Sequence, residues 1–403
     1  MLSLRLARGA HPLVLLRRVL VTVAAAGVGF LLLCSLGYAV AHPEQPEESV
    51  VRLLWCAVPF AATVQFALAV ARTDPATRPR DGLDALGLGP VRLSLLAAGS
   101  TALSCAVGGG AALLVYLELR GDLGGTPLSG TAKRLLDGGH ALPWAGTLTL
   151  LGLLPVVGAG TCALALRPRE PRRRGAHSGG GEAGPAPAPP APDRPSYAGL
   201  PWGTAVIAMG LALEAYVGHA PAPEPGRLLA LPGRDGAASP GLLGGWLLAS
   251  LGLVLAGPGL THWCGVAVAA GRPGPVRLLA GRMLQDTATR IGRPLGVLCA
   301  VASGALAAAE LYGAAWEPSG PRPFGPLTGL GAAVVMACVT ATAITAALDA
   351  RQIRSETTTA LLRLGIPASL LRGAAAVRTT VLVAVLAPLT WVIAELTALP
   401  LLR

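Results

Sequence analysis

Long apolar runs alternate with short polar stretches along almost the whole chain. Most of the runs reach the roughly 20 helical residues that are needed to cross a lipid hydrocarbon core. The pattern therefore predicts nine membrane-spanning helices, at 19–41, 51–71, 93–119, 142–166, 200–217, 242–270, 295–316, 327–348 and 379–402. The fifth run is the shortest, and the last one contains Pro388 and Pro400. The last run is also too short to cross twice, because two crossings take about 40 residues.

The composition supports the same fold class. Hydrophobic residues make up 53% of the chain and charged residues only 13%, and the mean hydropathy is +0.59. These values are typical of a polytopic membrane protein and not of soluble domains. We therefore expect an all-α membrane helix bundle of about nine to ten transmembrane helices.

Basic residues are concentrated in alternate loops. Three quarters of the 32 lysines and arginines fall in the segments 1–18, 72–92, 167–199, 271–294 and 349–378. The positive-inside rule therefore predicts that these segments and the N-terminus are cytoplasmic, in a multi-pass protein of the cell membrane. This distribution accounts for most of the net charge of +11 without a nucleic-acid partner, and we expect none.

The first run could also be a cleaved secretory signal, because Ala39-Val40-Ala41 looks like a signal-peptidase site. The apolar stretch from Val19 to Ala41 is longer than the roughly 7 to 15 residues of a signal h-region, which favours a membrane anchor.

The sequence contains no pattern typical of an enzyme or a metal site. No Cys-x-x-Cys or Cys/His spacing is present, because the seven cysteines are scattered through the apolar runs. The single lysine, Lys133, follows no glycine-rich loop, which excludes a P-loop ATPase within this chain. No combination of nucleophile, base and oxyanion donors is visible. We expect no catalytic residue, no bound metal and no cofactor.

Three acidic residues, Glu214, Glu310 and Glu395, lie at the outer thirds of predicted spans. Intramembrane acids can mark a proton or substrate path. Because all three lie near the outer interface, we expect their carboxylates to extend into water.

A charged, helix-prone segment follows the eighth run, from Asp349 to Arg378. As one helix it would carry a single apolar stripe, formed by Ile353, Thr357, Leu361 and Leu364. Gly365 and the following Pro367 would end it.

A similar segment, 72–92, also lies between two apolar runs and ends in Leu86-Gly87. It differs in being interrupted by Pro75, Pro79 and Pro90.

The two charged segments belong to a longer repeat. In each half a basic lead-in precedes a span, an outer loop, a second span, the charged segment and a third span, in the same orientation, which predicts two parallel repeats. We expect a first repeat of four spans at 1–166, two linking spans at 200–270, and a second repeat of three spans at 271–403. The Gly/Pro/Ala-rich stretch 167–199 has too little apolar content to fold and is predicted to be a disordered cytoplasmic linker.

At these residues the chain resembles the FtsX-like (MacB-type) ABC transporter permeases that have two fused repeats. The resemblance rests on 351–371, on 80–87 and on the lead-in 278–282. It implies that each charged segment is a coupling helix that docks in a groove of an ABC ATPase subunit supplied in trans. The coupling residues carried over by the resemblance are Arg80, Asp81, Leu83, Leu86, Gly87, Arg354, Glu356, Leu361, Leu364 and Gly365. Two features depart from the family: no loop is long enough for a large extracytoplasmic domain, and the second repeat has three spans.

The resemblance implies a permease subunit that couples ATP hydrolysis to export, or to extraction from the membrane, of an amphiphilic substrate. Membrane lipid is its second expected partner. A proton-coupled secondary transporter and a non-transporting scaffold or sensor are alternatives. For the charged segments themselves, the alternative is an interfacial helix that lies on anionic lipid.

Overall fold

The computed structural model describes most of the chain: residues 12–73, 90–122, 142–167, 199–219, 229–230, 237–238, 240–271, 274–314, 326–353, 355–365 and 367–402. Within these ranges the protein is almost entirely helical, and nine helices are long and apolar enough to cross a membrane. The predicted all-α multi-pass bundle is confirmed. The exception among the described residues is a minimal antiparallel ladder in which β1 (Leu229–Ala230) pairs with β2 (Ala237–Ala238).

Helices of the first half are α2 (Pro12–Ala41), α3 (Pro46–Thr73), α5 (Pro90–Arg120) and α6 (Trp144–Ala165). Those of the second half are α7 (Gly199–His219), α8 (Pro240–Ala269), α9 (Pro275–Ala314), α10 (Pro326–Ile353), α11 (Ser355–Arg363) and α12 (Ala368–Leu402). Six of these helices begin at a proline. Proline is favoured at the first helical position because its backbone angle is already helical and the missing N–H has no partner there.

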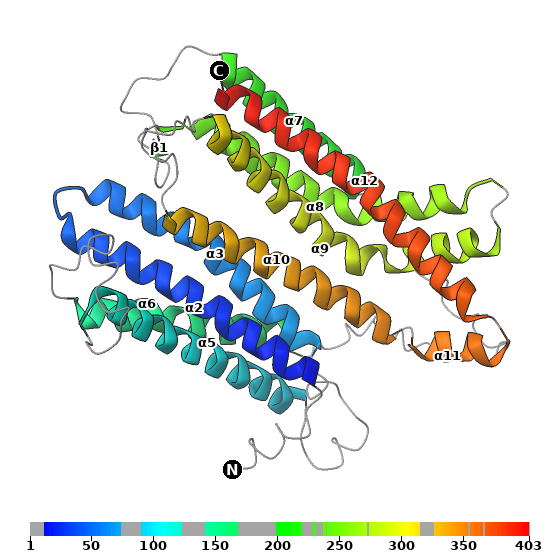
Figure 1. Cartoon of the computed structure of the whole chain (residues 1–403), viewed down its shortest axis with the longest axis horizontal. Helices are drawn as coiled ribbons and strands as arrows, with labels where there is room; N and C mark the ends of the chain where they lie inside the picture. Colours follow the sequence, from blue (N-terminus) through cyan, green and yellow to red (C-terminus); the bar gives the residue numbers. More distant parts are fainter. Residues whose placement is uncertain are drawn as a thin grey trace, which may run out of the picture.

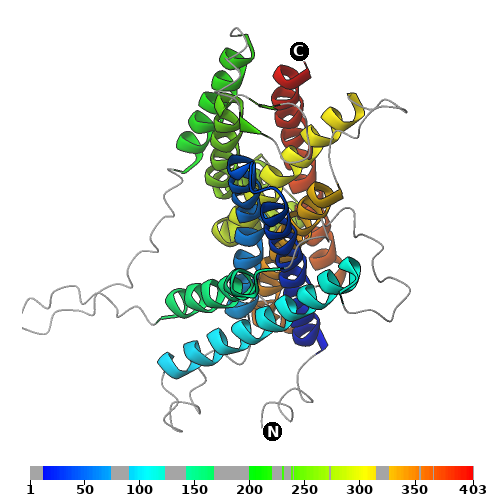
Figure 2. The same cartoon turned by 90° about the vertical axis from the view of Figure 1, so that its left-hand side faces the viewer.

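The helices form two groups joined by α10 (Figure 1). One group contains α2, α3, α5 and α6, with α5 and α6 crossing the others obliquely (Figure 2). The second group contains α7, α8, α9 and α12. Helix α10 follows α9 in sequence, yet it packs extensively against α3 and also contacts α2. Its buried Cys338 lies in one core cluster with Val21 of α2 and Phe66 of α3.

Helix α9 contains both a basic lead-in and a predicted membrane span. The basic lead-in and the apolar span 295–316 form one continuous helix of 40 residues that passes through Pro294. At 1.5 Å per residue this helix is about 60 Å long, roughly twice the hydrocarbon thickness. Its basic first half is therefore a helical extension of the span.

Helices α7 and α8 approach each other at backbone distance. A Cβ atom on Gly210 of α7 would lie 2.6 Å from both the amide nitrogen of Ala249 and the carbonyl oxygen of Gly245 on α8. Only glycine fits at such a crossing, and small residues are the usual means by which membrane helices pack this closely. The close approach determines the surroundings of Glu214, one turn further along α7.

Candidate functional site

Helix α11 lies at the end of the bundle where α2 begins and where α8 turns into α9 (Figure 1). These are the ends that the distribution of arginines predicts to be cytoplasmic. Helix α11 contacts α10 and lies between the end of α10 and the start of α12 (Figure 1). It is short and amphipathic, and it is the clearest candidate for a docking surface in the part of the chain that the structure describes.

The structure describes the predicted charged helix in two parts. Helix α10 ends at Ile353 and α11 begins at Ser355, and Arg354 between them lies outside the described residues. Serine and threonine side chains compete for backbone carbonyls and weaken helices. The Ser355 Oγ donates a hydrogen bond to the carbonyl oxygen of Gln352, with 2.6 Å between the two oxygens.

The C-terminal end of α11 agrees with the predicted stop at Gly365. The amide of Leu364 donates to the Ala360 carbonyl over 3.0 Å, and the amide of Gly365 donates to the Leu362 carbonyl over 3.1 Å. Gly365 has a φ of +87°, in the left-handed region that glycine adopts at no steric cost. Leu364 consequently lies in the turn after α11 and not on the helix itself.

The outer surface of α11 is apolar and basic. The side chain of Leu364 is 80% exposed and that of Leu362 is 45% exposed. Leu364 and Arg363 line a shallow hollow with Ser355, Thr359 and Ala360. Leu362 at the end of α11 and Leu364 in the turn that follows it are exposed beside Arg363, and together they form a surface suited to a groove with an apolar floor and an acidic rim.

The other predicted coupling residues are not all placed. Leu361 and Glu356 lie within α11, whereas Arg354 falls outside the described residues. The first charged segment also lies outside them, including Arg80, Asp81, Leu83, Leu86 and Gly87.

Glu214 differs from the expectation for the three intramembrane acids. Its side chain is 2% exposed, between α7 and α8, and does not extend into water. A Cβ on Gly245 of α8 would lie 2.5 Å from the Glu214 Cγ, so the acid fills the space that this glycine leaves. Neither carboxylate oxygen has a hydrogen-bond partner among the described residues. In contrast, Glu310 is exposed and Glu395 is half-buried.

The position of Glu214 near the outer interface predicts exposure, whereas the glycine spacing of α7 and α8 indicates burial. Gly203 and Gly210 on α7, and Gly245 and Gly252 on α8, repeat every seven residues. This spacing places glycines on one face of each helix and could have indicated a close helix pair. An acid four residues after Gly210 would then face the partner helix.

Within the described residues, no group of three or more histidine, cysteine, aspartate or glutamate side chains is arranged to hold a metal ion. The seven cysteines are free thiols, and six of them are buried. Comparison of the chain with protein-family models, with curated proteins and with solved structures finds no match, so the functional proposal rests on the geometry described above.

Proposed function

We propose that this multi-pass membrane protein is the permease subunit of an ABC transporter of the FtsX-like type. A separate ATPase subunit docks on α11, and ATP hydrolysis drives export or membrane extraction of an amphiphilic substrate. The observation that carries the proposal is α11 itself, an amphipathic helix at the predicted cytoplasmic end with Leu362 and Leu364 exposed. The remaining proposed coupling residues of this segment are Glu356 and Leu361 within α11, Gly365 in the turn after it, and Arg354, which lies outside the described residues.

The packing of the two halves supports the proposal. In the first half, α2 packs against both α3 and α5, and in the second half α9 packs against both α10 and α12. The second helix of each half, α3 and α10, pack against each other. This arrangement is what two repeats in the same orientation would produce, with their second helices meeting across a pseudo-two-fold axis.

The position of α11 in the chain suggests how a motor would act through it. Helix α11 directly follows α10, which joins the two groups of helices, and directly precedes α12, which packs against α9. A displacement of α11 would therefore pull on both groups. Burying leucine side chains in the partner supplies affinity, because each is worth about 1.5 to 3 kcal/mol when fully removed from water.

The proposal is tested by purifying the full chain from its native membrane in neutral detergent and measuring ATP hydrolysis in the eluate. We expect hydrolysis to co-purify with the unaltered chain and to be lost with Leu364→Asp. Leu278→Asp is the matched control, because Leu278 is exposed at the predicted cytoplasmic end of α9, a helix that is not among those packed against α11. Absence of ATPase activity from the unaltered complex, or equal loss in both variants, would overturn the proposal.

A proton-coupled secondary transporter is the second candidate, and the burial of Glu214 is the observation that favours it. A carboxyl group held among apolar helices without a partner is a potential proton carrier. This candidate predicts that Glu214→Gln stops substrate flux, and that flux depends on the proton gradient and not on ATP. The permease proposal predicts that substrate flux persists in Glu214→Gln, and that flux depends on ATP and not on the proton gradient.

A further inference from the structure

Helices α8 and α9 each contain an internal proline, and the two prolines lie at the same level of the helix pair. Pro258 lies inside α8 and Pro294 inside α9. The helices touch here at backbone distance, because a Cβ atom on Gly292 of α9 would collide with the backbone of Pro258. Further along α9, a Cβ on Gly296 would lie 2.6 Å from the carbonyl oxygen of Leu253. The main chains of α8 and α9 are thus in direct contact at the level of the two prolines.

Proline interrupts the hydrogen-bond ladder of a helix, because it has no amide hydrogen to donate to the carbonyl four residues earlier. The carbonyls affected are those of Val254 in α8 and Arg290 in α9. Glycines near each proline weaken the helices further, since glycine loses the most conformational freedom on folding. Both helices are consequently easiest to bend at one shared level. Figure 1 shows both of them bending on the way to their predicted cytoplasmic ends.

The cytoplasmic side of this level is a small three-helix unit with its own core. This unit, which we call the stalk, consists of residues 259–269 of α8, 275–291 of α9 and 368–377 of α12. Its core contains the buried Val268, Ala280 and Ala374, one from each helix. A Cβ on Gly281 of α9 would lie 2.6 Å from the carbonyl oxygen of Gly265 on α8. Packing as close as this makes the stalk one body.

The exposed residues of α8 place the paired prolines at the cytoplasmic membrane interface. On one side of Pro258 the exposed side chains are leucines, including Leu251 and Leu255. On the other side they are Trp263, which is 56% exposed, and then Ala267. Leucine suits the hydrocarbon region, and tryptophan suits its boundary with water. The stalk therefore extends from the membrane into the cytoplasm.

Helix α12 also changes its surroundings at this level. Its Val381 packs on the stalk core, whereas Leu382 packs on the core of the membrane-spanning part. Close to this change, the hydroxyl of Thr379 shares its hydrogen between the carbonyl oxygens of Ala375 and Ala376, over 3.1 and 2.9 Å. A threonine that bonds to a carbonyl of the preceding turn often bends a helix. All three helices therefore carry a feature that promotes bending where the stalk meets the membrane.

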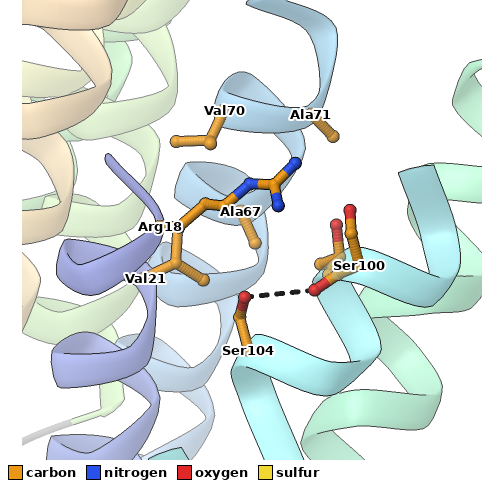
Figure 3. Close-up of a pocket in the computed structure, with 8 residues that line it drawn as sticks. Arg18, Val21, Ala67, Val70, Ala71, Ser100 and Ser104 are labelled. Carbon is orange, nitrogen blue, oxygen red and sulfur yellow. Dashed lines mark hydrogen bonds between the residues drawn. The ribbon is translucent and has the colours of Figure 1, made fainter. Parts of the chain in front are cut away.

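The cytoplasmic end of the first group of helices differs from the stalk. Helices α2 and α5 contain no proline after their first residues, Pro12 and Pro90. They pack with α3 around a hollow of about 20 Å³, which Arg18 and Ser104 help to line (Figure 3). The cytoplasmic ends of α2 and α5 are therefore continuous with their spans, and they provide a fixed reference for movement of the stalk.

We propose that the stalk turns as one body about the paired prolines, and that this movement carries force from α11 into the membrane. The stalk is joined to α11 through residues 364–367. A partner that moves α11 therefore moves the start of α12 and, through the stalk core, the end of α8 and the start of α9. The pivot is a property of this chain, whereas the source of the force rests on the proposed function.

Pulsed electron paramagnetic resonance on the full chain in lipid nanodiscs measures the pivot directly. The native cysteines are replaced by alanine, and spin labels are attached at two exposed positions of α9, Asp286→Cys in the stalk and Glu310→Cys near the other end. A straight helix would separate these positions by about 36 Å. The control is a pair within the stalk, Asp286→Cys with Arg372→Cys, both exposed. We expect a broader distance distribution across the pivot than within the stalk.

Alanine in place of both prolines restores the two missing amide donors. The double variant Pro258→Ala, Pro294→Ala should narrow the distribution across the pivot to the width of the control pair and shift its mean toward the straight-helix distance. Pro155→Ala is the matched control variant, because Pro155 lies inside α6 of the first group, and it should change neither distribution. If the double variant fails to fold, Pro294→Ala alone replaces it and should narrow the distribution in part.

Two results of the distance measurement would overturn the pivot. One is a distribution across the prolines that is as narrow as the one within the stalk. The other is a broad distribution that the proline variants leave unchanged.

Transport in proteoliposomes connects the pivot with the proposed function. The double variant should keep its ATPase, and its ATP-dependent flux should fall about tenfold, which corresponds to about 1.4 kcal/mol, because two restored hydrogen bonds must break before the helices bend. Unchanged flux in a variant whose distance distribution has narrowed would refute a role of the pivot in transport. If no ATPase co-purifies with the unaltered chain, the proposed function fails, while the distance measurement still decides the pivot.

Discussion

Replacing Glu214 by leucine should stabilise the protein. The carboxyl group is 2% exposed between α7 and α8, and neither of its oxygens has a hydrogen-bond partner among the described residues. Leucine has a similar size and leaves no polar atom without a partner. If Glu214 neither transfers protons nor binds a ligand, its removal should eliminate the free-energy cost of burying a carboxyl group without hydrogen-bond partners.

The free-energy cost of burying Glu214 can be estimated from its two carboxyl oxygens. A buried polar group without a partner costs about 1 to 3 kcal/mol. A protonated carboxyl loses at least one donor and one acceptor, which sets the expected gain for Glu214→Leu at about 2 kcal/mol or more. A gain of this size raises the melting temperature of a chain this long by a few degrees.

The assay compares melting temperatures in detergent and ATP-dependent transport in proteoliposomes. Glu310→Leu is the control, because Glu310 is exposed on α9 and its replacement should leave the melting temperature unchanged. Under the permease proposal, Glu214→Leu melts higher and keeps its activity. A lower melting temperature would refute the inference that the carboxyl group lacks a stabilising partner, and a stabilised but inactive variant would favour proton coupling.

Three further predictions concern α11 and the close helix pair. Gly365→Ala should cost about 1 kcal/mol locally, because only glycine adopts the φ of +87° without strain, and hydrogen exchange should show faster exchange in α11 while α12 is unchanged. Ser355→Cys should react with a membrane-impermeant maleimide in inside-out vesicles and not in right-side-out vesicles; the reverse result would invert the topology. Gly245→Leu should separate α7 from α8 and lower the melting temperature, whereas Gly244→Leu, with only Leu213 within 4.0 Å, should do so much less.

Much of the fold followed from the apolar runs. A run of 20 or more apolar residues has few stable alternatives to a membrane-spanning helix, because backbone polar groups in lipid must be satisfied internally. The shortest run, 200–217, was therefore placed to within about two residues of α7. Helix α3 begins at Pro46, five residues before the predicted start at Val51, because the polar first turn Pro46–Ser49 is helical but does not belong to the apolar run.

The candidate site was only partly predictable. Gly365 correctly marked the end of α11, because a glycine followed by a proline is a local signal. The burial of Glu214 and of Arg17 depends on the packing between helices. Their surroundings are provided by α8 and α3, and contacts between helices are not encoded in the periodicity of any one of them.

The position of α10 has a consequence for how the chain is held together. By sequence it belongs after the linker, yet it packs against α3 and α2, which come before the linker, as well as against α9, which comes after it. After a single proteolytic cut between Arg167 and Gly199, the two fragments should therefore stay associated. The two fragments should elute together in size-exclusion chromatography. They should also assemble when they are co-expressed as two separate polypeptides.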